Sequence, residues 1–74
     1  MTEEKKQALE NYFARQLKRM KHFDDTDTKV TFFKYCCSTV MMADLSSPNA
    51  EEQKALEILW DEWRPKLEKE AYGR

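Results

Sequence analysis

Residues 29–43 read KVTFFKYCCSTVMMA, and the conformation of this stretch decides the fold. Several of its residues, among them Val30, Phe32 and Val40, belong to types that are enriched in strands. A strand here would find no second strand-like run in the chain to pair with, and an isolated strand is unstable. A helix over about 29–43 is therefore predicted, because it gains one coherent apolar face. That face consists of Val30, Phe33, Cys37, Val40 and Met41.

The helix predicted over 29–43 is apolar on more than one side. Phe32 and Cys36 broaden its main apolar face, whereas Tyr35 and Met42 emerge on a different side. A helix that is apolar nearly all round has to be covered on more than one side. We therefore expect this helix to be the central element of the fold.

The residues before this stretch form an amphipathic pattern over about 3–23. At 100° per residue the apolar side chains fall within one arc of about 140°, which is typical of a core-facing stripe. They are Leu9, Tyr12, Phe13, Leu17, Met20 and Phe23, and only Gln16 interrupts them. Acidic residues open the segment and basic residues close it, as the helix dipole favours. A helix is therefore predicted here as well.

A third helix is predicted over about 48–72. Ser47 offers a capping hydroxyl, and Pro48 follows at the first helical position. Pro65 cannot donate a backbone hydrogen bond to the carbonyl of Asp61, so we expect a helix that is kinked there or split into two. The apolar stripe consists of Leu56, Leu59, Trp60, Trp63, Leu67 and Ala71.

Together these patterns predict a single all-α domain over residues 1–74, built as a small three-helix bundle with the second helix central. The composition, 36% charged and 41% hydrophobic, is too apolar for a disordered tail and too polar for a membrane protein. Cys36 and Cys37 are adjacent and cannot connect distant segments, so we expect a reducing, cytoplasmic compartment. No membrane partner is expected.

Catalytic and metal-binding patterns are missing from the sequence, so neither enzymatic activity nor a cofactor nor a metal is expected. Cys36, Cys37 and His22 are the only soft ligands, and a closed metal site needs four. We interpret the two cysteines as buried apolar residues. The acidic run 24–27 lacks the glycine and closing glutamate of a calcium loop and is interpreted as a helix cap.

Apolar side chains are more numerous than three short helices can bury in one small core. The surplus includes Trp, Tyr and Met, which are enriched at protein interfaces. The leading hypothesis is a small cytoplasmic interaction module, an accessory or inhibitory factor that forms a homodimer and occludes or bridges a larger protein. A bacterial or phage origin is a hypothesis from size alone. The candidate contact residues are Tyr35, Met42, Ile58, Trp60 and Trp63.

A basic face on the first helix supports an alternative of a different class. Arg15, Lys18, Arg19 and Lys21 have no acidic residue among them and could follow a phosphate backbone. The alternative is therefore a nucleic-acid-contacting regulatory protein. A net charge of −1 is far from that of dedicated nucleic-acid binders. A solvated helix face, or a docking patch for an acidic protein, explains the same residues.

Overall fold

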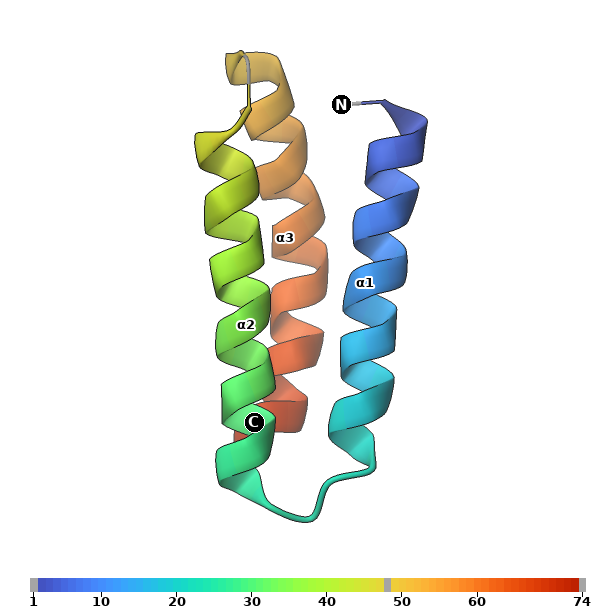
Figure 1. Cartoon of the computed structure of the whole chain (residues 1–74), viewed down its shortest axis with the longest axis vertical. Helices are drawn as coiled ribbons and strands as arrows, with labels where there is room; N and C mark the ends of the chain where they lie inside the picture. The colour runs from blue at the N-terminus through green and yellow to red at the C-terminus, as the bar shows by residue number, and fades with distance from the viewer. Residues whose placement is uncertain (1, 48, 74) are drawn as a thin grey trace.

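Three helices make up the fold in the computed structural model, which describes residues 2–47 and 49–73 (Figure 1). Helix α1 comprises Glu3–Lys21, α2 Thr26–Leu45 and α3 Ala50–Tyr72. Successive helices run in opposite directions, and each packs against the other two. No strand occurs within the two described ranges. The predicted all-α three-helix bundle is confirmed.

Capping side chains explain where the helices begin. The hydroxyl of Thr2 accepts a hydrogen bond from the backbone N–H of Lys5 at 3.2 Å, and the carboxylate of Asp25 accepts one from the N–H of Thr28 at 3.1 Å. Both side chains satisfy an N–H group that the first helical turn leaves unpaired. The acidic run was therefore interpreted correctly as a cap, and α2 begins at Thr26, three residues before the predicted start.

The cap of α3 differs from the prediction. Asn49, not Ser47, accepts a hydrogen bond from the N–H of Glu52 at 2.9 Å, and α3 begins at Ala50. The hydroxyl of Ser47 instead donates to the carbonyl of Ala43 at 2.9 Å. Ser47 therefore belongs to the end of α2, because its hydroxyl reaches the last free carbonyls of that helix. The predicted role of residue 48 lies outside the described residues.

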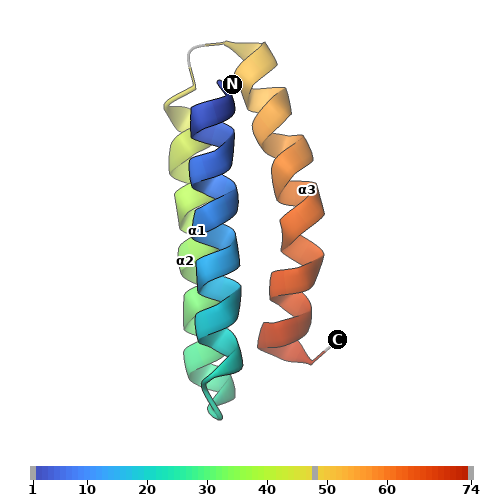
Figure 2. The same ribbon diagram turned by 90° about the vertical axis from the view of Figure 1, so that its right-hand side faces the viewer.

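Helix α3 passes through Pro65 without a break, so the predicted split does not occur. Figure 2 shows α3 as one ribbon that is bowed along its length. Pro65 removes the hydrogen bond to the carbonyl of Asp61. Both residues are exposed, so water can satisfy that carbonyl. The proline is tolerated because it stands on the outer side of the helix.

The core lies along the line where the three helices face one another. Phe13 is fully buried, and its ring centroid lies 5.4 Å from that of Trp60 and 6.1 Å from that of Trp63. Trp60 also stacks on Phe33 at 6.3 Å, so this aromatic cluster joins α1, α2 and α3. The buried apolar residues are Phe13, Met20, Phe33, Cys36, Leu56, Leu59, Leu67 and Ala71.

Two side-chain contacts hold α2 to its neighbours at the edges of the core. The hydroxyls of Tyr12 and Thr39 share a hydrogen bond of 3.2 Å between α1 and α2. The ammonium of Lys29 lies 3.2 Å from the carboxylate of Glu70, between α2 and α3. These contacts fix which side of α2 faces inward.

Replacing Trp60 by alanine is expected to destabilise the fold by about 3 kcal/mol, because the ring packs against two helices. That loss is a large part of the stability of so small a domain, which is roughly 0.05–0.15 kcal/mol per residue. Arg15→Ala, at an exposed position, serves as control and should change stability by less than about 0.5 kcal/mol. Urea unfolding followed by circular dichroism measures both, and equal transition midpoints would contradict the proposed core.

Candidate functional site

The five apolar candidates do not form one surface. Tyr35, Met42 and Ile58 are 59%, 65% and 63% exposed. Trp60 and Trp63 are half-buried and pack against the core, so they offer a partner less apolar area than the sequence suggested. Neither tryptophan is among the large apolar residues that the structure leaves exposed.

Ile58 belongs to a different part of the surface from Tyr35 and Met42. It lies on α3 and lines a hollow with Lys6 of α1 and with Leu59 and Glu62. Tyr35 and Met42 both project from α2. Periodicity gives the direction of each side chain on its own helix but not which neighbouring helix lies beside it, so the sequence could not separate these residues.

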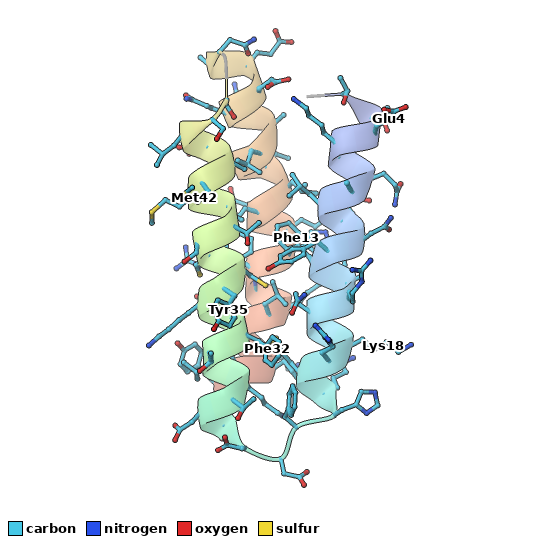
Figure 3. All side chains as sticks on the ribbon, in the orientation of Figure 1. Glu4, Phe13, Lys18, Phe32, Tyr35 and Met42 are labelled. Atoms are coloured by element: carbon cyan, nitrogen blue, oxygen red, sulfur yellow. The ribbon has the colours of Figure 1, made fainter. Side chains whose placement is uncertain are left out.

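Among the described residues, four of the six exposed large apolar side chains lie on α2. Met41 and Leu45 are 63% and 77% exposed and join Tyr35 and Met42 there. We call Tyr35, Met41, Met42 and Leu45 the outer face of α2. Figure 3 shows Met42 on the side of α2 that points away from α1.

Helical geometry gathers these four residues on one side. At 100° per residue they fall within an arc of about 120°. The core residues Phe33 and Cys36 lie on the opposite side of the helix. Met41 was predicted on the core face, whereas Leu45 was missed because α2 extends two residues beyond its predicted end.

A shallow groove beside the outer face extends toward α3, with both apolar and charged residues in its lining. The groove has a volume of about 350 Å³. Met41 forms part of its wall together with Cys37 and Val40 of α2 and Trp60 of α3. A partner lying on the outer face would therefore also meet this groove.

The two thiols are poorly suited to catalysis. Burial, with a smaller contribution from the neighbouring Cys37, raises the pKa of Cys36 to about 11. Burial also raises the pKa of the Cys37 thiol. A thiol attacks as the thiolate, which a raised pKa disfavours at neutral pH. Within the described ranges, no group of three His, Cys, Asp or Glu side chains is placed to hold a metal ion.

The native chain is accordingly expected to react slowly with iodoacetamide at pH 8, with Cys36 the slower of its two thiols. Urea-unfolded chain should react much faster, because its thiols have the ordinary pKa and are exposed. Because the pKa of Cys36 is higher in the folded than in the unfolded state, the free energy of unfolding is also expected to fall as pH rises from about 9 to 11. Over that range the thiol ionises in the unfolded state first. Mass spectrometry of the alkylated peptides measures the rates, and equal rates in native and unfolded chain would contradict this burial.

In the structure, two lysines of α3 extend the basic face that the sequence predicts on α1. Arg15, Lys18, Arg19 and Lys21 are all exposed, and Figure 3 shows Lys18 pointing away from the bundle. Two lysines that the sequence analysis did not select, Lys66 and Lys69 of α3, line a hollow of about 480 Å³ together with Lys21. We call these three residues the lysine cluster. No local signal could have found it, because it depends on how α1 and α3 pack.

Charge is incompletely balanced at the lysine cluster. Glu70 lines the same hollow, but its carboxylate is paired with Lys29. The ammonium of Lys66 lies 4.6 Å above the ring of Trp63, a cation–π contact. Across residues 2–47 and 49–73, no carboxylate lies within ion-pair distance of the three ammonium groups. The cluster could therefore attract an anion.

No protein-family model matches the sequence, and neither the curated proteins nor the solved structures contain a match. Among the described residues, no helix has the length and apolar character that crossing a membrane requires.

Proposed function

We propose that this chain is a small protein–protein interaction module that binds through the outer face of α2. The supporting observation is the exposure of four large apolar side chains on one side of a helix whose other side is buried. Given roughly 150–250 Å² for an aromatic side chain and somewhat less for Met and Leu, these four partly exposed residues present on the order of 500 Å². An apolar patch of that size is at the upper end of those on ordinary monomers and often marks a binding site.

The proposed module acts by binding to the surface of its partner and catalyses no reaction itself. Binding through α2 would occlude the apolar surface of a larger protein. Where the partner is a second copy of this chain, binding through α2 would instead form a homodimer, which would bridge larger proteins through the remaining surface of each copy. An accessory or inhibitory factor works in this way. The free thiols Cys36 and Cys37 are compatible with a reducing compartment, and we propose that the protein acts in the cytoplasm.

Capture experiments with matched variants test the proposal. The tagged chain, used as bait in an extract of its own source cells, is expected to retain a specific protein. Met42→Lys should lose that protein, because a charge in the contact face would be desolvated on binding. Ile58→Lys is the control, since Ile58 is as exposed as Met42 but lies elsewhere. Equal recovery with Met42→Lys and with the unchanged chain would contradict the proposal.

A nucleic-acid-contacting regulator is a second candidate, favoured by the lysine cluster that extends the basic face of α1. If this candidate is correct, a labelled DNA duplex binds, and its log affinity falls by about 0.9 per phosphate contact for each log unit of salt. Charge reversal at Arg15 and Arg19 should weaken binding and flatten that slope, whereas Met42→Lys should leave both unchanged. Fluorescence anisotropy across a salt series measures this. No binding even at low salt would remove this candidate and leave the first untouched.

A further inference from the structure

We infer that the occupant of the outer face of α2 is a second copy of this chain, docked antiparallel so that the two α2 helices cross next to Ser38. The inference rests on the proposed function, because it names the partner of the same face. Four features carry it: the spacing of the exposed residues, the small residue at their centre, the placement of charge and the area.

The exposed residues recur at the spacing that lets two helices pack side by side. Tyr35, Ser38, Met42 and Leu45 are separated by steps of three, four and three residues. Alternating steps of three and four residues, which average about 3.5 when the pattern continues, keep one seam of a helix facing a partner helix. The inner side of α2 is used within the bundle, so the helix carries a second seam on its outer side.

Ser38 lies in the middle of the outer seam. Its small side chain between Tyr35 and Met42 lets a second helix approach closely, because the distance between packed helices depends on the side chains at the contact. With a two-fold axis between Ser38 and Thr39, Tyr35 lies level with Met42 of the second copy. Thioether–aromatic contacts are favourable, and the symmetry supplies two of them.

Charge favours the antiparallel direction. Lys34 is the only charged residue between positions 30 and 43. In a parallel pair the two Lys34 ammonium groups would lie side by side and repel. In the antiparallel pair they are about 14 Å apart along the helix axis, beyond the screening length of about 8 Å at physiological salt. Each Lys34 then lies close to the level of Asp44 of the second copy.

The area fits a second copy of this face. A stable dimer buries about 800 Å² on each partner. The four exposed apolar residues supply more than half of that, and the exposed residues Thr31, Lys34 and Ser38 on the same side of α2 add to it. A two-fold pair uses the same patch on both chains, so a face whose one charged residue, Lys34, is held apart from its symmetry copy is matched by itself.

Light scattering coupled to gel filtration tests the inference. The chain should elute at concentrations of tens of micromolar with twice its mass of 8.9 kDa. Met42→Lys and, independently, Leu45→Lys should weaken self-association at least about 30-fold, the loss typical of a central contact residue. Ile58→Lys should remain dimeric. Circular dichroism checks that each variant keeps its helices, as expected for exposed positions.

Cysteine cross-linking tests the direction of pairing in a chain that lacks the two natural cysteines. Ser38→Cys should form an intermolecular disulfide on mild oxidation. An equal mixture of Thr31→Cys and Leu45→Cys chains should form the mixed disulfide, whereas Leu45→Cys alone should not form one. Efficient cross-linking of Leu45→Cys with itself would overturn the antiparallel arrangement.

Two further results would overturn the inference. One is a monomer at every concentration up to the millimolar range, and the other is a dimer that Ile58→Lys dissociates as strongly as Met42→Lys. Failure here is distinguishable from failure of the proposed function. A monomeric chain whose captured protein is still lost with Met42→Lys keeps the interaction module and removes only the second copy.

Discussion

A helix in a three-helix bundle can bury only the side that faces its two neighbours, and α2 is apolar on both sides. Its inner side is held by the aromatic cluster, in which Phe33 of α2 stacks on Trp60. Once that side is fixed, Tyr35 and Met42 have no position in the core. The exposed apolar face therefore follows from the way the core is packed, and the proposed function depends on it.

The aromatic cluster also limits how much of the two tryptophans of α3 a partner could contact. Phe13 lies beside both Trp60 and Trp63, so the two largest side chains of α3 are used to join the helices. The indole Nε1 of Trp63 is the one buried side-chain polar atom, among those described, that lacks a hydrogen-bond partner. Leaving this buried N–H unpaired costs about 1–3 kcal/mol. The unpaired group belongs to a residue that packs against the core, not to a residue of the outer face of α2.

Periodicity in the sequence was sufficient for the helices and for most of the core. It correctly assigned Phe33 and Cys36 to the interior and Tyr35 to the outside, because direction on a helix depends only on spacing. It could not show that Ile58 lies beside α1, or that Lys66 and Lys69 approach Lys21, because those placements depend on which helices are neighbours. The cap at Asn49 was missed because Ser47 offers the same capping chemistry two residues earlier.

Self-association through the outer face of α2 is tested most directly by NMR, from the solvent exposure of individual methyl groups as the protein concentration is raised. With a soluble paramagnetic agent, the methyl groups of Met41 and Met42 should be strongly relaxed in dilute solution and become protected as concentration rises. The methyl groups of Ile58 should stay exposed throughout and serve as the internal reference. If Met42 and Ile58 remain equally exposed at every concentration, the outer face of α2 does not mediate self-association, and the central claim is contradicted.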